Sequence, residues 1–177
     1  MSKQTMPFRF VYRILQIAMA LIPASIGSLG FLNDLSNFQG GVKNLVVPLV
    51  TMAGDTKNFT WRALPPSLAP YLYTLMFCAE FVTGILAVIG IVMMIKNFLK
   101  SSIAFERSKH WIYIACIWGT LVWGLGFFEG AGDWFLAWKS KNATISGLQL
   151  GALMGVIELF FVFFYLKYCR ESDLELQ

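Results

Sequence analysis

Two glutamates lie inside apolar segments of the sequence, where a carboxyl group could carry a proton or bind a cation. Glu80 lies within the run from Tyr71 to Ile95, and Glu158 lies within the run from Leu148 to Leu166. At a rise of about 1.5 Å per residue, each glutamate would lie roughly 13–16 Å into a membrane helix, near the bilayer midplane. Carboxyl groups at that depth usually face the protein interior and mark proton or ion routes.

Three interpretations of this pair stay open. No Lys or Arg lies deep in any apolar run, so the carboxyls are either protonated or neutralised by a cation, water or a base from another chain. Two protonated acids could form hydrogen bonds to neighbours such as Ser28, Thr83 or Thr120 and hold the helices together. The pair could instead carry protons or cations, or contact another subunit.

A second group of polar and aromatic residues flanks the apolar runs, and we call it the outer collar. Its members are Asn33, Asp34, Trp61, Arg62, Glu129, Asp133, Trp134 and Trp138. Tryptophan suits a membrane boundary because its ring is apolar and its N–H needs a polar partner. The acids could bind Ca²⁺ or Mg²⁺, but they form no spaced coordination loop. We therefore predict solvated acids and no metal site.

Motifs for catalysis or cofactor binding are absent from the sequence. Its single histidine, His110, is predicted on the opposite side of the membrane from most of the acids, so no nucleophilic triad can form. Walker-type and dinucleotide-binding glycine motifs are absent as well. We expect no cofactor and no enzymatic activity, and an enzyme acting at the outer surface is the last of three functional alternatives.

Composition places these residues in a membrane protein, because 57% of the 177 residues are hydrophobic and only 14% are charged. A helix crosses the hydrocarbon core in about 20 residues, and only helices or closed barrels satisfy their backbone groups there. Four runs are long enough, at about residues 10–32, 71–95, 111–129 and 147–167. We predict an all-α bundle of four transmembrane helices, with an inner loop at 96–110 and outer loops at 33–70 and 130–146 that fold into a small cap.

One segment of the longer outer loop is apolar but too short to span a membrane. It runs from Leu45 to Met52, and we predict an element that lies on the membrane surface.

Basic residues indicate which side of the membrane each loop faces. Nine Lys and Arg residues lie near the termini and in the inner loop: Lys3, Arg9, Arg13, Lys96, Lys100, Arg107, Lys109, Lys167 and Arg170. The outer loops contain five: Lys43, Lys57, Arg62, Lys139 and Lys141. The positive-inside rule then predicts cytoplasmic termini. The basic residues are scattered, so we expect no nucleic-acid partner. The start of the chain resembles a signal peptide, but its apolar run continues past Pro23 to Leu32, so we expect it to be retained.

Small residues recur at helical spacing in the predicted spans and indicate close helix packing. Ala20, Ala24 and Ser28 recur in the first span, and Gly84 and Ala87 follow Glu80 in the second. The later spans carry Gly126 with Gly130, and Gly147, Gly151 and Gly155, which form GxxxG patterns. We predict that these glycines mediate helix packing and that Glu158 shares the face of the last three.

The order of these features resembles the DUF2165 family of predicted small integral membrane proteins of unknown function. The residues Trp123, Gly126, Phe127, Gly132, Asp133, Trp134, Phe135, Trp138 and Ser140 are similar to the family pattern LW-x-x-GF followed by GG-[ED]-WF-x-x-W-x-S. Asn33, Asp34, Asn37, Trp61, Arg62, Ala63, Glu80, Phe105 and Lys109 also fit, whereas Lys141, Asn142 and Ala143 replace a Trp-Asn-Gly turn. The resemblance implies a four-helix protein of the bacterial inner membrane and supplies no activity.

Small size, glycine-lined faces and the absence of a catalytic constellation favour a structural or accessory subunit of a larger membrane complex. A small transporter or channel for protons or cations that uses Glu80 and Glu158 is the alternative. We expect the lipid bilayer and either a partner membrane subunit or a second copy of the chain as partners.

Overall fold

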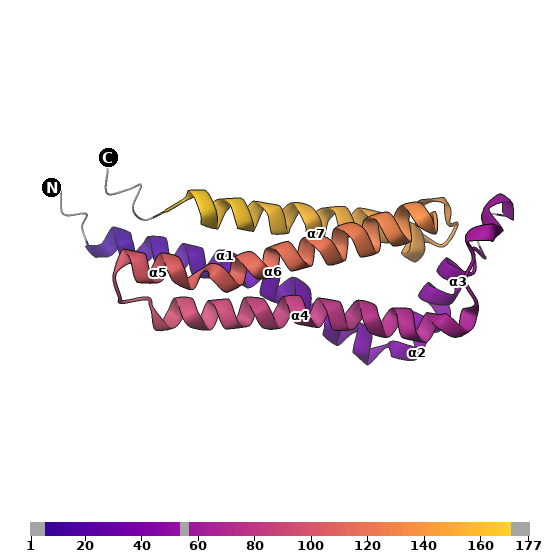
Figure 1. Ribbon diagram of the computed structural model, residues 1–177, viewed down its shortest axis with the longest axis horizontal. Helices are drawn as coiled ribbons and strands as arrows, with labels where there is room; N and C mark the ends of the chain where they lie inside the picture. Colours follow the sequence, from indigo (N-terminus) through magenta and orange to yellow (C-terminus); the bar gives the residue numbers. More distant parts are fainter. Residues whose placement is uncertain (1–5, 54–56, 171–177) are drawn as a thin grey trace.

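Four long helical rods run side by side along the molecule (Figure 1). The computed structural model describes residues 6–53 and 57–170, and within these residues every regular element is helical. The rods are α1 (Met6–Ser36), α4 (Ala69–Lys96), α6 (His110–Leu121) continued by η4 (Val122–Trp134), and α7 (Ala143–Tyr168). The start of α1 and the end of α7 lie at the same end of the bundle, which we call the terminal end (Figure 1).

All four rods are long and apolar enough to cross a membrane. The described residues contain four such segments, at Phe8–Ser36, Phe59–Lys96, Ser102–Trp134 and Ala143–Tyr168. This confirms the predicted all-α bundle of four transmembrane helices. The helices extend beyond the predicted spans at several ends, because their first and last turns carry polar residues that an apolar run does not include. The short α5 (Ser102–Ser108) leads from α4 into α6.

The opposite end of the bundle carries a folded cap. It contains α2 (Phe38–Gly41), η1 (Val42–Val46), α3 (Val47–Val50), η2 (Lys57–Arg62), η3 (Pro66–Leu68) and η5 (Ala137–Lys139). Val46 and Val50 pack in one cluster with Tyr73 and Phe77 of α4, and Leu49 packs with Ala131 of η4. The apolar segment from Leu45 to Met52 therefore packs on the bundle as part of the cap core, and its position at the membrane surface stays a prediction.

The most extensive helix contact among the described residues is between α1 and α4, and small residues make their close approach possible. A Cβ atom on Gly27 would lie 2.6 Å from the main-chain oxygen of Glu80 and 2.8 Å from the Cα of Gly84. A Cβ atom on Gly84 would in turn lie 2.7 Å from the Ser28 hydroxyl. Only glycine leaves room for this contact, which holds α1 beside Glu80.

Candidate functional site

Glu80 lies in the interior of the bundle, against α1. Its exposed fraction is 5%, and a Cβ atom on Gly30 would lie 2.7 Å from its Oε2 atom. The absence of a side chain at Gly30 therefore creates the space that the carboxyl group occupies. Among the described residues, Oε2 has no hydrogen-bond partner. The alternative in which Ser28, Thr83 or Thr120 forms a hydrogen bond with this oxygen is therefore not what the described residues show.

A second carboxyl group lies one helical turn beyond Gly30, toward the cap. Asp34 of α1 is half-buried, and it is close enough to interact electrostatically with Glu80. The Tyr73 hydroxyl of α4 is close enough to the Asp34 carboxyl group to interact with it. Glu80, Asp34 and Tyr73 thus form a polar row between α1 and α4 that extends from the middle of α4 toward the cap.

Glu158 does not join this row. Its side chain is exposed on the surface of α7, whereas Glu80 is buried between α1 and α4. The prediction that both carboxyl groups face the interior was therefore right for Glu80 and wrong for Glu158. Any route that needed both glutamates side by side is not present in this bundle.

The position of Glu158 follows from the geometry of α7. Successive residues turn by about 100°, so glycines four residues apart drift by roughly 40° at each step. Gly155 has turned far enough to be buried against the Trp123 ring, and a Cβ atom there would lie 3.0 Å from the ring Cδ1. Gly147 and Gly151 stay on the exposed side, where a Cβ would meet nothing within 4 Å. The three glycines therefore do not share one face, and the predicted packing role is correct only for Gly155 within this chain.

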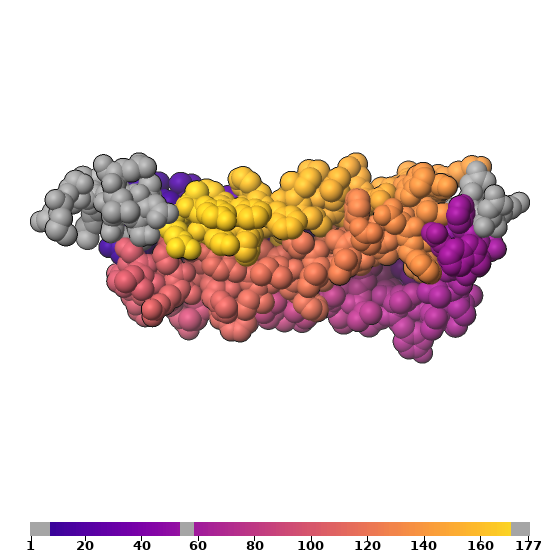
Figure 2. Space-filling view, turned by 45° about the horizontal axis from the view of Figure 1, so that its top comes forward, coloured from indigo at the N-terminus to yellow at the C-terminus, as the bar shows by residue number. Residues whose placement is uncertain are grey.

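We call the exposed row on α7 the α7 stripe. It consists of Gly147, Gly151, Met154, Glu158 and Phe161, and all five are exposed. These residues fall at intervals of four, three, four and three, so they form one side of the helix. Figure 2 shows α7 lying along the outside of the bundle over its whole length.

Gly126 and Gly130 do not pack against a helix either. A Cβ atom on Gly126 would meet nothing within 4 Å, and one on Gly130 would be 3.3 Å from the main-chain oxygen of Leu125 in its own segment. The cause is the winding of η4, which is a π-helix and turns its residues through smaller steps than an α-helix. The two glycines line a cavity instead.

The outer collar comes together only in part. Arg62 donates hydrogen bonds from one guanidinium nitrogen to the main-chain oxygens of Asp133 and Trp134, each at 3.2 Å. The Trp61 and Trp134 rings meet edge to face at 6.0 Å, and the Arg62 guanidinium lies over both rings. This cation and its aromatic neighbours tie the two outer loops to each other.

The remaining collar residues are separate from that contact. Asn33, Glu129 and Trp138 are exposed, and the Asp133 carboxyl group accepts a hydrogen bond from Gln149 at 3.3 Å. Asp34 belongs to the polar row with Glu80. Within the described residues, no group of three or more His, Cys, Asp or Glu side chains could hold a metal ion.

A buried group of cations at the terminal end was missed by sequence reasoning. Arg13 is 2% exposed and donates hydrogen bonds to the main-chain oxygens of Phe98 and Lys100, just beyond the end of α4. Lys109 is fully buried, forms a 2.7 Å ion pair with Glu106 and donates to the Leu166 main-chain oxygen of α7. These cations satisfy carbonyl groups at helix C-termini, where positive charge is favoured.

The same group also anchors the end of α7 to α1. Gln16 is fully buried and donates a 2.7 Å hydrogen bond to the Cys169 main-chain oxygen, which also accepts from the Tyr12 hydroxyl. The helical spacing of Tyr12, Arg13 and Gln16 is the only sequence signal that could have placed all three on one face.

Comparison with known proteins identifies the family. Residues 12–166 match the family model DUF2165, described as a predicted small integral membrane protein, and the chain belongs to this family. No curated protein and no solved structure matches it.

Proposed function

We propose that this DUF2165 protein is an accessory subunit of a larger membrane complex and that it packs against another membrane-spanning protein through the α7 stripe. The observation that carries the proposal is Glu158, an ionisable side chain that is exposed on α7. It lies at about 15 Å from the helix end at Tyr168, given a rise of about 1.5 Å per residue, and thus near the bilayer midplane.

A carboxyl group that faces acyl chains at this depth is unfavourable by about 3 kcal/mol or more. A second membrane helix would relieve that cost if it offered a hydrogen-bond donor or a base at the same depth. Gly147 and Gly151 lie on the same side of α7 and carry no side chain that would keep a second helix at a distance. The stripe thus combines a polar group that needs a partner with a surface that permits a close backbone approach.

The distribution of charge supports the inner membrane as the location, with both termini in the cytoplasm. The terminal end carries Lys109, Arg13 and most of the other basic residues of the loops and tails, and such an excess is typical of the cytoplasmic side. The cap would then face the periplasm, and the partner would be an inner-membrane protein.

Purification from native membranes tests this proposal. We expect the tagged protein, extracted in a mild detergent, to copurify with one membrane protein in fixed stoichiometry. The variants Gly151→Leu and Glu158→Leu should lose that partner while the bundle stays folded, because both positions are exposed. The matched control is Phe160→Leu, which changes an exposed position outside the stripe.

Two results would contradict the proposal. A monodisperse particle that contains only one copy of the chain would leave the stripe without a partner. A particle that contains only copies of this chain would assign the stripe to self-association and would overturn the role as a subunit of a larger complex.

A further inference from the structure

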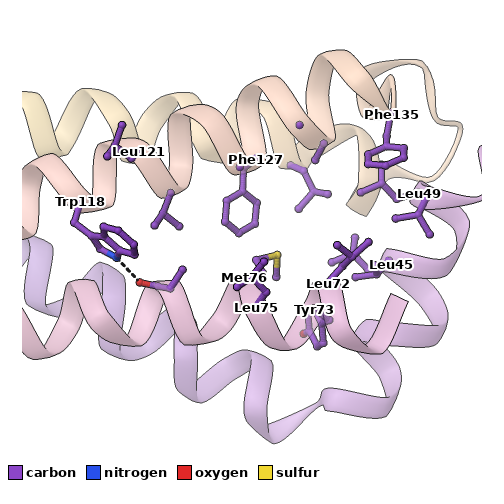
Figure 3. A pocket seen from close by; sticks show the side chains of 18 residues that line it. Leu45, Leu49, Leu72, Tyr73, Leu75, Met76, Trp118, Leu121, Phe127 and Phe135 are labelled. Carbon is purple, nitrogen blue, oxygen red and sulfur yellow. Dashed lines mark hydrogen bonds between the residues drawn. The ribbon is translucent and has the colours of Figure 1, made fainter. Parts of the chain in front are cut away.

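An apolar cavity of about 380 Å³ separates α4 from η4 near the cap (Figure 3). Met76 and Leu72 of α4 form one wall, and Phe127 of η4 forms the facing wall. Leu45 and Leu49 of the cap close one end (Figure 3). Most of its lining residues belong to two of the segments that could cross a membrane, Phe59–Lys96 and Ser102–Trp134.

The cavity lies beyond a contact between α6 and α4, at a point where two residues of η4 are glycines. The indole N–H of Trp118 donates a 2.9 Å hydrogen bond to the main-chain oxygen of Ala79, which fixes α6 to α4 (Figure 3). Further toward the cap, Gly126 and Gly130 form part of the wall. A Cβ atom on Gly126 would meet nothing within 4 Å, so this glycine leaves space open in the wall.

The chemistry of the wall selects an apolar occupant. Its side-chain polar groups are the Trp118 N–H and the Tyr73 hydroxyl. The Trp118 N–H already donates to the main-chain oxygen of Ala79, and the Tyr73 hydroxyl already interacts with the Asp34 carboxyl group. A polar ligand would therefore lose its hydration without gaining hydrogen bonds from these side chains, which is unfavourable.

The size and the mouth of the cavity narrow the choice of occupant. One turn of a helix about 10 Å wide and 5.4 Å long fills roughly 420 Å³, so a partner helix does not fit. Leu75, Leu121 and Gly126 belong to the wall and are exposed on the outside of the bundle. The cavity consequently opens sideways, toward the acyl chains of the bilayer.

We propose that this cavity binds one acyl chain of a bilayer phospholipid, which enters between α4 and η4 from the membrane. The cavity of about 380 Å³ is larger than the apolar cavities of about 150 Å³ that bind benzene. It lies at the lower end of the range of about 300–1,000 Å³ for ligand sites. The proposal does not depend on the proposed function, because no residue of the α7 stripe lines the cavity.

Photolabelling in vesicles tests the proposal. The full chain is reconstituted into phosphatidylcholine vesicles that contain a small fraction of phosphatidylcholine with a diazirine near the end of one acyl chain. Labelled residues are then mapped by mass spectrometry. Phe127 lines the cavity and is 9% exposed, whereas Leu159 is 0% exposed and does not line it. We expect Phe127 to be labelled several-fold more than Leu159, and equal labelling would overturn the proposal.

A substitution that fills the cavity provides the second measurement. Gly126→Phe places a ring in the empty space, so labelling of Met76 on the facing wall should fall several-fold. The control is Leu125→Phe, which adds the same ring at a neighbouring position that is exposed, and it should leave Met76 labelling unchanged. Unchanged labelling in the Gly126→Phe protein would contradict the assignment. If that variant cannot be purified, the comparison of Phe127 with Leu159 in the unsubstituted protein decides the question.

Discussion

Gly27 sets the distance between α1 and α4, because a Cβ atom there would press on the backbone of α4. Backbone atoms inside a helix cannot move aside as a flexible side chain can. We therefore expect Gly27→Ala to lower the free energy of unfolding by about 1–3 kcal/mol, the usual cost of overpacking. Unfolding of the reconstituted or detergent-solubilised protein, followed by tryptophan fluorescence, measures the change.

Gly147→Ala is the matched control for this prediction. A Cβ atom at Gly147 meets nothing within 4 Å, so the same change of residue should leave stability nearly unaltered. Equal stabilities for Gly27→Ala and Gly147→Ala would show that α1 and α4 do not meet closely at Gly27.

The burial of Lys109 was not predicted from the sequence. Its charge entered the topology argument, yet the structure buries it fully in an ion pair with Glu106. Breaking such a pair leaves a poorly solvated charge, and Lys109→Met should lower the free energy of unfolding by about 3 kcal/mol. Arg107→Met, at an exposed position of the same loop, should have little effect, and a comparable loss in both variants would contradict the prediction.

Individual residues show how far the sequence could predict the candidate site. Glu80 could be placed in the interior because Gly84 and Ala87 mark the packed face of its helix. The exposed position of Glu158 could not be predicted in this way. Three glycines at a spacing of four suggest one face of the helix, although each step of four residues moves the position around the helix axis. Only the position of neighbouring helices decides which of those glycines is covered.

At the scale of elements, one side of α7 packs inside the bundle and the other side faces outward. Gly155 faces the Trp123 ring, where a Cβ atom would lie 3.0 Å from ring atom Cδ1, whereas Gly151 faces outward. We expect Gly155→Leu to destabilise the bundle by about 1–3 kcal/mol through overpacking, and Gly151→Leu to leave its stability unchanged. Thermal unfolding of the two variants in the same detergent checks this difference, and equal melting temperatures would refute the division of α7 into two sides.

The winding of η4 was beyond sequence prediction. The spacing of Gly126 and Gly130 predicts a packed stripe only if the segment is an α-helix, but residues Val122–Trp134 form a π-helix. Such winding is rare, and the local sequence carries no signal that specifies it. Existence and order of the helices could be predicted because hydrophobic runs of sufficient length have no other stable form in lipid.

At the scale of the whole molecule, both ends of the chain lie at one end of the bundle (Figure 1). The excess of basic residues there predicts that this end is cytoplasmic. A cysteine introduced as Lys139→Cys in the cap should react with a membrane-impermeant maleimide on intact spheroplasts. The natural Cys169, which is exposed at the terminal end, should react only after lysis. Reaction of Cys169 before lysis would contradict the predicted orientation and would place the terminal end in the periplasm.

The central claim is that the α7 stripe contacts another membrane protein, and a photoreactive diazirine amino acid at position 154 in native membranes tests it most directly. Met154 lies on the stripe between Gly151 and Glu158, so irradiation should yield one discrete adduct with a partner membrane protein. The same amino acid at the exposed position 160 should yield lipid adducts alone. Lipid adducts alone at position 154 as well would contradict the claim.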